Sequence, residues 1–325
     1  MSSINRTRSA VMLTVLLLLL PLAGVLYADD DELPYYSALR TSDAPHIDGI
    51  LDDECWAKAG KTVSFVAIGG KAVAVSTRGM SCWDGQSLYL AFICEEPLMK
   101  VIEERIAHGK MGGFEESVEI FLDADYDRST YMQLRISITG DRESRKGTEL
   151  CSDIHDGWPA SVRRYEDKWI AEAAIPFKFL DEGCPHPDTV WGLNLNRQRL
   201  VGGEQGKYTC WSDTKGAFAT PARFGNLVFA DYALWLRQYF GKAIGGLTAE
   251  AADLMMHYPV AGKPMLEELN RLDGLWAEFV RMLPAIAPGD ASELSGMIAR
   301  GRAVAGRYEE FLARLRLAVI GTAFR

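Results

Sequence analysis

Short runs in which apolar and polar residues alternate occupy most of the chain from about residue 60 to residue 230. A period of two is typical of strands that bury one face, and turn-forming residues separate the runs. In SCWDGQSLYLAF, Asp84 and Gly85 supply the tight turn of a hairpin. Further runs of this kind are VSFVAI, SVEIFLD, YMQLRISI, KWIAEAAI, VWGLNLNRQR and NLVFA. The pattern predicts a mainly β fold, an antiparallel β-sandwich.

After about residue 231 the hydrophobic period changes to that of helices. One apolar stripe follows Pro264, which is suited to a first helical turn, and a shorter helix is expected before it, around residues 248–257. The two longer stripes contain Leu266, Leu269, Leu272, Leu275, Trp276, Phe279 and Leu283, and then Leu294, Met297, Ile298, Val304, Tyr308, Phe311, Leu312 and Leu315. We expect residues 231–325 to be a C-terminal helical region that packs on the sandwich or on a protein partner.

The first 28 residues have the pattern of a secretory signal peptide. Arg6 and Arg8 precede the apolar run VMLTVLLLLLPLAGVL, and Ala28 stands just before the acidic run DDDE, where a signal peptidase could cut. Leu26 is a poor residue three positions before that cut, so retention of the segment as an N-terminal anchor stays open. With cleavage, we expect a secreted protein, extracellular or periplasmic, without a membrane span.

The remaining chain is expected to consist of a linker at residues 29–42, the sandwich at 43–230 and the helical region. Removing the signal takes two positive charges from a net charge of −9 and leaves −11. No basic stripe is present, so binding to nucleic acid is not expected. Six cysteines follow the signal and permit up to three disulfides in any of fifteen pairings, among which the sequence does not choose.

Three glutamates cluster in GGFEESVEIFLD: Glu115, Glu116 and Glu119. A pair of carboxylates is what a glycoside hydrolase needs. However, alternation places Glu119 on the opposite strand face from Val118 and Ile120, while Glu115 and Glu116 are expected in the preceding loop. A solvated strand face accounts for all three residues, and polar binding from that face is the main alternative.

In YMQLRIS, the same alternation places Gln133 and Arg135 on one strand face. Beside a glutamate on a neighbouring strand, they would form a polar site suited to the paired hydroxyls of a sugar, which both donate and accept hydrogen bonds. A surface ion pair between Arg135 and Glu119 is the simpler alternative. Trp211 stands before a loop of small and turn-forming residues, SDTKGAFATPARF, which favours a role as a lid or a platform.

Several motifs occur in one order between residues 43 and 230: PHIDGILDDECWAKA, WDGQSLYLAFICEEPLM, ESVEIFLDAD, YMQLRIS, WIAEAAIPF, WGLNLNRQR and WSDTKGAFATPARFGNLVF. In this order they resemble family 9 carbohydrate-binding modules. The resemblance implies a jelly-roll-like sandwich that binds sugars, often at the reducing end of a glycan. It does not imply catalysis.

The resemblance also implies roles for single residues. The binding glutamate of the family's VEIF strand resembles Glu119, its Q-x-R pair resembles Gln133 and Arg135, and its WSD tryptophan resembles Trp211, which would then be a stacking platform. Many members hold the sugar against a second tryptophan just before the VEIF strand. This chain has KMGGFEESVEIF there, and Phe114 is the expected substitute.

The segment DADYD offers Asp123, Asp125 and Asp127 as hard oxygen ligands. The family is known for structural calcium, so the resemblance implies that these residues could hold such an ion, while an ordinary acidic turn is the alternative. The segment lacks the twelve-residue EF-hand pattern. We expect no cofactor to be required.

Two other functions stay open besides non-catalytic sugar recognition in polysaccharide breakdown. Sandwiches of similar shape carry haem in secreted redox proteins, for which His108, Met111 and Met132 would be the candidate axial ligands. A glycoside hydrolase, acting on O-glycosyl bonds, is the second.

Overall fold

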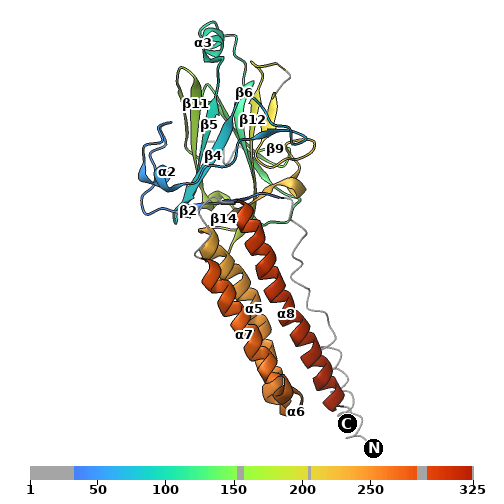
Figure 1. Ribbon diagram of the computed structural model, residues 1–325. Helices are drawn as coiled ribbons and strands as arrows, with labels where there is room; N and C mark the ends of the chain where they lie inside the picture. The colour runs from blue at the N-terminus through green and yellow to red at the C-terminus, as the bar shows by residue number, and fades with distance from the viewer. Residues whose placement is uncertain (1–32, 152–156, 204–205, 284–290, 324–325) are drawn as a thin grey trace, which may run out of the picture. The chain divides into compact units, whose positions relative to one another are not determined.

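The computed structural model describes residues 33–151, 157–203, 206–283 and 291–323. The chain divides into two compact units, one formed by Leu33–Trp235 and the other beginning at Leu236. The first unit contains two β-sheets and the second contains helices (Figure 1). The prediction of a β-sandwich followed by a helical region is therefore confirmed.

The larger sheet has nine strands among the described residues. Its order is β1 (Tyr35–Ser37), β14 (Gly225–Val228), β12 (Val190–Arg199), β6 (Glu116–Asp123), β7 (Met132–Ser137), β8 (Arg142–Lys146) and β9 (Glu149–Leu150), with β13 (Tyr208–Cys210) paired to β12 and β3 (Val66–Ala67) paired to β13. The smaller sheet has the order β10 (Ala160–Arg164), β11 (Lys168–Pro176), β5 (Ser87–Glu95), β4 (Thr77–Trp83) and β2 (Leu39–Arg40).

The alternating runs fold into these strands because each buries one set of side chains between the two sheets. The resulting core includes Leu90 and Phe92 from the smaller sheet and Ile120, Leu134 and Leu195 from the larger one, all fully buried. The other face of the nine-stranded sheet, called the outer face below, carries polar and aromatic side chains. This face positions the candidate site.

The described part of the segment expected to link the signal to the sandwich, residues 33–42, contributes strands to both sheets. Within residues 29–42, β1 pairs in parallel with β14 and β2 pairs in parallel with β4. These two short strands precede the expected boundary at residue 43, and the sandwich is antiparallel except at their pairings. The signal peptide expected at residues 1–28 lies outside the described residues.

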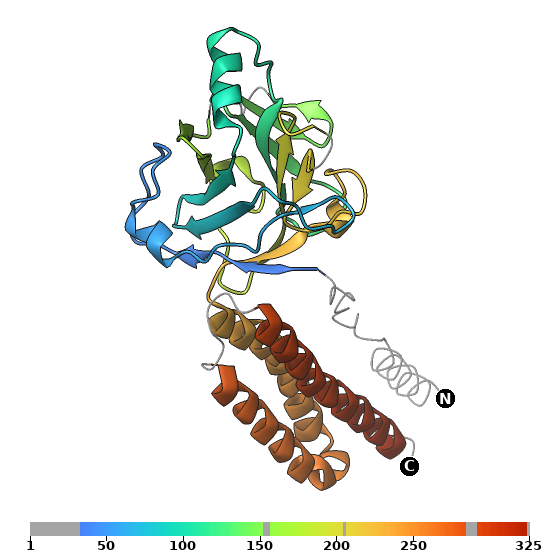
Figure 2. The ribbon, with the colours of Figure 1, turned by 45° about the horizontal axis from the view of Figure 1, so that its top comes forward.

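Short helices accompany the sheets, and long helices follow them. The first unit contains α2 (Glu54–Lys58), α3 (Met99–Ala107), η1 (Phe177–Phe179) and η2 (Pro221–Arg223). The chain continues with α5 (Tyr232–His257), α6 (Pro259–Gly262), η3 (Lys263–Met265), α7 (Leu266–Met282) and α8 (Ala291–Ala323), and α5, α7 and α8 run side by side in Figure 2. The helix expected at 248–257 therefore begins sixteen residues earlier, at Tyr232.

The long helices pack through aromatic side chains. The rings of Phe240 in α5 and Phe279 in α7 lie 5.8 Å apart, edge to face. Gly301 in α8 allows a close approach, because a Cβ atom there would lie 2.2 Å from the Phe240 ring. None of the described helices combines the length and the apolar character needed to cross a bilayer.

Candidate functional site

A row of charged side chains crosses three neighbouring strands on the outer face. Glu119 in β6 stands directly opposite Arg135 in β7, which stands directly opposite Glu143 in β8. Residues in such register share one face of a sheet. Because Ile120 and Leu134 point into the core, the charged row points away from it. The prediction that Gln133 and Arg135 share a face with a glutamate of a neighbouring strand is correct.

The row is joined by short polar contacts. Gln133 Nε2 donates to Glu119 Oε2 at 2.7 Å, and Arg135 Nε lies 3.3 Å from Glu119 Oε1. Arg135 Nη1 also donates to Glu143 Oε1 at 3.2 Å, and Arg145 Nε donates to the same oxygen at 2.8 Å. Charges of alternating sign therefore follow one another across the sheet, which holds the donors in fixed positions.

Burial decreases from β6 to β8. Glu119 is only 4% exposed, whereas Gln133, Arg135 and Glu143 are half-buried. Burial raises the pKa of Glu119, against the opposing charge of Arg135 and the hydrogen bond from Gln133. The hydrogen bond from Arg145 lowers the pKa of Glu143. The expectation of a solvated face is therefore wrong for Glu119, whose carboxylate is enclosed and orients two more exposed donors.

Asn196 extends the row in the other direction. It stands opposite Glu119 in β12, it is fully buried, and neither its amide nitrogen nor its oxygen has a hydrogen-bond partner among the described residues. A buried amide without partners is costly, and such a group in a native fold calls for a bound molecule or water. Asn196 was not predicted as a site residue, although its position next to Leu195 in VWGLNLNRQR is a signal for the polar face of the strand.

Trp211 is not part of the outer face. Its side chain is 5% exposed and belongs to the main core, edge to face with Tyr36 at 5.9 Å. The ring also packs so tightly on Gly225 that a Cβ atom there would lie 2.5 Å from it. Because Cys210 stands opposite Asn196 on the outer face, the following residue points inward. The expectation that Trp211 is a stacking platform is corrected accordingly.

Other aromatic residues do lie beside the row. Phe114 precedes β6 and is half-buried, and the Arg135 guanidinium lies over its ring, 4.2 Å from the centroid. Tyr208 stands opposite Gln198 on the outer face and is 40% exposed, with its ring 5.7 Å from that of half-buried Phe218. Tyr208 and Phe218 were not predicted, because the loop that contains Phe218 was used only to interpret Trp211.

The three aspartates of the β6–β7 turn lie together. One carboxylate oxygen from each of Asp123, Asp125 and Asp127 lies within 4.8 Å of the other two. Burial, followed by the hydrogen bond to Asp125, raises the pKa of Asp123 to about 6. Hydrogen bonds from Thr130 and Ser129 lower the pKa of Asp127 to about 2. This all-oxygen donor set fits a hard cation such as Ca²⁺, which would also relieve the repulsion felt by buried Asp123.

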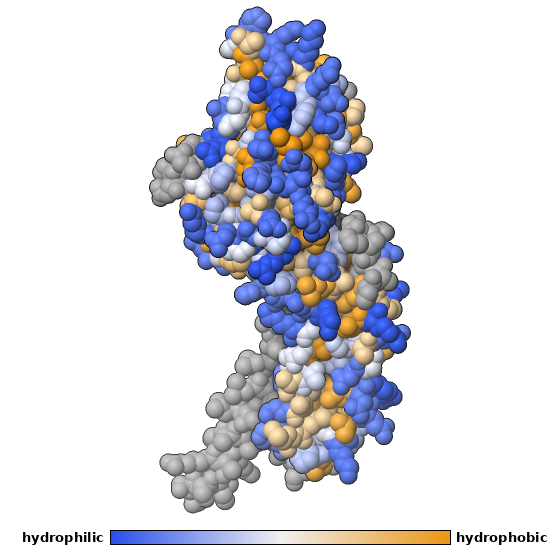
Figure 3. All heavy atoms as spheres, turned by 90° about the vertical axis from the view of Figure 1, so that its left-hand side faces the viewer, coloured by the Kyte–Doolittle hydropathy of each residue, from blue (hydrophilic) through white to orange (hydrophobic). Residues whose placement is uncertain are grey.

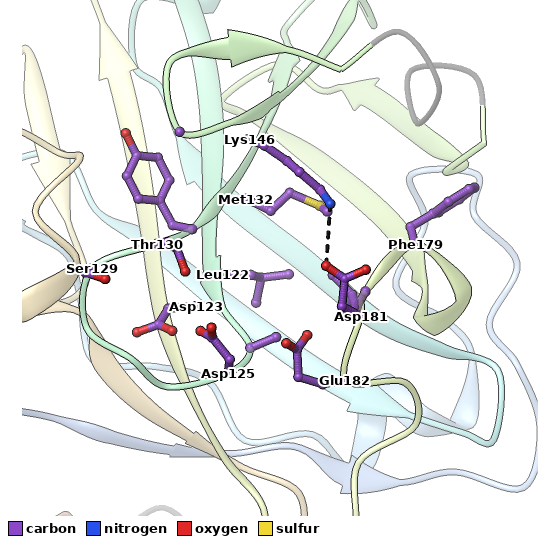
Figure 4. Close-up of a pocket in the computed structure, with 14 residues that line it drawn as sticks. Leu122, Asp123, Asp125, Ser129, Thr130, Met132, Lys146, Phe179, Asp181 and Glu182 are labelled. Carbon is purple, nitrogen blue, oxygen red and sulfur yellow. Dashed lines mark ion pairs between the residues drawn. The ribbon is translucent and has the colours of Figure 1, made fainter.

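A cavity of about 470 Å³ adjoins this turn. In Figure 4, Asp123 and Asp125 lie on one side of the cavity, and the side chains of Lys146 and Asp181, whose charged atoms are 3.7 Å apart, lie across from them. Met132 is 6% exposed and also lines the cavity. The acidic turn is therefore accessible to solutes from this side.

The residues considered for other chemistries are dispersed. Glu116 is the first residue of β6 rather than part of a loop, and it is buried on the core side, opposite Arg199. Glu115 forms an ion pair with Arg105. His108 is exposed at the end of α3 and contacts the carbonyl oxygen of Glu104, whereas Met132 is buried and Met111 packs against the main core.

The chain was compared with known proteins. Residues 47–231 match the model of the family described as carbohydrate family 9 binding domain-like. Endo-1,4-beta-xylanase A of Thermoanaerobacterium saccharolyticum is 27% identical over 192 residues, which are 57% of this chain and 15% of that protein. The chain thus spans about one seventh of the length of this relative.

Solved structures were also found. A carbohydrate binding module family 9 from Caldicellulosiruptor kristjanssonii, in complex with cellotriose, aligns with a TM-score of 0.46 at 16% identity, covering 60% of this chain and 93% of the other. The same module in complex with glucose aligns with a TM-score of 0.45 at 18% identity, covering 60% and 94%.

Proposed function

Because the chain belongs to the carbohydrate family 9 binding domain-like family, we propose that it is a non-catalytic carbohydrate-binding protein whose site is the outer face of the nine-stranded sheet. In this proposal, Gln133 and Arg135 donate hydrogen bonds to neighbouring hydroxyls of a sugar. Glu119 orients both donors from below. The relatives bound to cellotriose and glucose make a glucose-type sugar the first ligand to test.

The observation that carries the proposal is the polar row of the outer face together with Asn196. The carboxylate of Glu119 already fixes Gln133 and Arg135 in place, so little side-chain freedom is lost when a ligand binds. The two partnerless atoms of the Asn196 amide lie next to this group. Because this amide is fully enclosed, a buried water molecule rather than the sugar itself would satisfy these two atoms.

Aromatic contacts in this proposal come from Phe114 and the Tyr208–Phe218 pair rather than from Trp211. Stacking one aromatic face removes on the order of 100 Å² of apolar surface from water, or roughly 2.5 kcal/mol. Arg135 lies over one side of Phe114, so in this proposal a sugar would stack on the opposite face of that ring. With association costing at least about 4 kcal/mol, we expect dissociation constants in the micromolar to millimolar range.

Titration calorimetry of the full chain with glucose, cellobiose, cellotriose and xylo-oligosaccharides tests the proposal. We expect Gln133→Ala to weaken binding at least about tenfold, since one charge-supported donor is lost. Glu149→Gln, a change of an exposed residue of neighbouring β9, serves as the matched control and is expected to leave affinity unchanged. Full binding by a folded Gln133→Ala variant would refute the outer face as the site.

Hydrolysis of O-glycosyl bonds is the alternative function, and the same protein and oligosaccharides can be used to test it. Glu119 and Glu143 are both tied to Arg135, so neither carboxylate is free to attack or to carry a proton without breaking an ion pair. We expect no release of reducing ends from the oligosaccharides that bind. Release that disappears in Glu119→Gln would instead make the protein a glycoside hydrolase.

We also propose that the protein is secreted. A secreted module would hold its glycan near enzymes of polysaccharide breakdown, where weak binding suffices because the effective concentration is high. N-terminal sequencing of the protein from the culture fluid or periplasm, with an expected start at Asp29, tests both secretion and cleavage after Ala28.

A further inference from the structure

Two cysteines that are distant in sequence lie together on the smaller sheet. Cys55 in α2 and Cys82 in β4 belong to one buried cluster, separate from the main core, and are 5% and 1% exposed. Both side chains also line one small cavity beside α2, and both cysteines are free thiols. Tyr89, which stands opposite Cys82 in β5, belongs to the same cluster. The pair therefore lies where α2 covers the outer side of this sheet.

Other contacts hold α2 in this position. Trp56 Nε1 donates to Glu172 Oε1 in β11 at 2.8 Å. The backbone N–H groups of Asp48 and Gly49 donate to Glu172 Oε2 at 3.1 and 2.5 Å. The segment around Cys55 is thus anchored on the sheet by three hydrogen bonds, which keep Cys55 in the same buried cluster as Cys82.

The remaining cysteines are placed elsewhere. Cys94 lies in the main core, and Cys210 lies on the outer face of the other sheet, opposite Asn196. Cys151 is partly buried and Cys184 is exposed, each in a connection between strands. Among the six cysteines, all of which lie in the described residues, Cys55 and Cys82 share one buried cluster.

We propose that Cys55 and Cys82 form a structural disulfide when the protein folds in an oxidising compartment. The oxidant is a small-molecule disulfide such as oxidised glutathione. One cysteine thiolate attacks it and releases one glutathione thiol, and the second cysteine then attacks the mixed disulfide and releases the other. The protein loses two protons and two electrons, and the glutathione disulfide is reduced to two thiols.

The surroundings favour a lasting bond over a reactive one. Burial raises the pKa of both thiols, so in the folded state few thiolates are present to exchange. The bond is therefore formed while the chain folds and is protected afterwards. A cavity of about 310 Å³, lined by both cysteines together with Asp53 and Lys58, leaves room for α2 to shift as the sulfur atoms move to bonding distance.

Peptide mapping of the full chain tests this proposal. The protein is refolded with reduced and oxidised glutathione, labelled with an alkylating reagent under denaturing conditions and digested without reductant. We expect one peptide pair that joins Cys55 to Cys82 and is lost on reduction, with Cys94 and Cys210 labelled. Full labelling of Cys55 and Cys82, or a cross-link from either one to another cysteine, would overturn the proposal.

A stability measurement gives a second readout. Closing the loop between the two cysteines should raise the melting temperature of the oxidised protein by roughly 6 °C or more over the reduced one. Cys55→Ala should abolish this difference between oxidised and reduced samples, and the exposed Cys184→Ala should preserve it. A wild-type protein that melts identically in both states would count against a structural disulfide.

Discussion

The burial of Trp211 indicates a core residue, and a single substitution can distinguish this role from that of a sugar-stacking platform. Trp211→Ala should leave a cavity against Tyr36 and Gly225 and destabilise the protein by about 3–5 kcal/mol. The variant, while still folded, should bind sugar as the wild type does. Urea unfolding and titration calorimetry measure both effects.

Phe218→Ala is the counterpart, since this half-buried ring packs on Tyr208 of the outer face. It should cost little stability and weaken sugar binding. If Trp211→Ala were instead stable and unable to bind sugar, the platform role would have to be restored.

Glu116 should make stability depend on pH. Its burial raises its pKa from 4.5 to about 7, against the hydrogen bond from Val201 and the charge of Arg197. Between pH 4.5 and 7 the folded protein keeps a proton that the unfolded chain releases, so this residue lowers the free energy of unfolding as pH rises through that window. Glu116→Gln cannot titrate and keeps an oxygen for Val201.

The variant should therefore lose less stability than the wild type between pH 4.5 and 7, and it should be the more stable protein at pH 8 by roughly 1–3 kcal/mol. Urea unfolding at several pH values measures this. Glu149→Gln, at an exposed position, is the control and should follow the wild type. Parallel profiles of wild type and Glu116→Gln would show that the Glu116 carboxyl is ionised throughout.

The sequence predicted which residues share a strand face, but not how deeply each is buried. Alternation correctly grouped Gln133 and Arg135 and separated Glu119 from Ile120. The burial of Trp211 depends on Tyr36 and Gly225, which a local pattern cannot connect to it. Its neighbouring turn residues made it look exposed for this reason.

At the level of elements, the β6–β7 turn should respond to calcium. With free Ca²⁺ about 100-fold above its dissociation constant, binding would add about 2.7 kcal/mol of stability and raise the melting temperature by several degrees. Asp125→Asn should remove the effect, because one of the three clustered carboxylates is lost. Asp181→Asn is the matched control, since Asp181 lines the same cavity without belonging to the cluster.

The stabilisation by Ca²⁺ should also depend on pH. The pKa of Asp123 is raised to about 6, so this carboxyl is partly protonated below that pH. Because a proton competes with the ion for the carboxylate, the stabilisation by Ca²⁺ should grow as pH rises from 4 to 7. A melting temperature that calcium leaves unchanged at pH 7 would identify the segment as an ordinary acidic turn.

Long strands and helices were predictable because the hydrophobic period repeats several times along each of them. The hairpin of β4 and β5 and the helix α7 follow directly from such patterns. By contrast, β1 and β2 have three and two residues, too few for a pattern, and their partners β14 and β4 are remote in sequence. Short parallel edge strands of this kind become visible only once the sheet exists.

On the scale of the whole molecule, the helical unit presents apolar side chains that the sandwich proposal does not use. Met256, Val260 and Leu266 are 71%, 78% and 50% exposed around the connection from α5 to α7. On the face drawn in Figure 3, orange apolar and blue polar side chains are interspersed over the helices. The sequence predicts a protein partner for the C-terminal helices. These exposed apolar side chains are compatible with that prediction, which stays untested.

The first unit should fold without the helices, provided that its edge strands are kept. Tyr36 in β1 accepts a hydrogen bond from the Ser81 backbone at 2.7 Å and donates one to the Gly60 carbonyl at 2.5 Å, and Trp235 at the start of α5 packs on Tyr35 with ring centroids 5.4 Å apart. A chain of residues 33–235 retains all of these contacts. We expect it to unfold in one cooperative transition and to bind sugar with the affinity of the full chain.

A chain of residues 43–230, which follows the boundaries suggested by the sequence motifs, lacks β1, β2 and the start of α5. It leaves β14 without its parallel partner and Trp211 without the Tyr36 ring. Loss of a buried tyrosine and an edge strand should lower its melting temperature by roughly 10 °C or more, or make it insoluble, through exposed apolar surface. Thermal melting and gel filtration compare the two chains. Equal stability of both would mean that residues 33–42 only lie against the sandwich, and that the sequence-based boundary was the correct one.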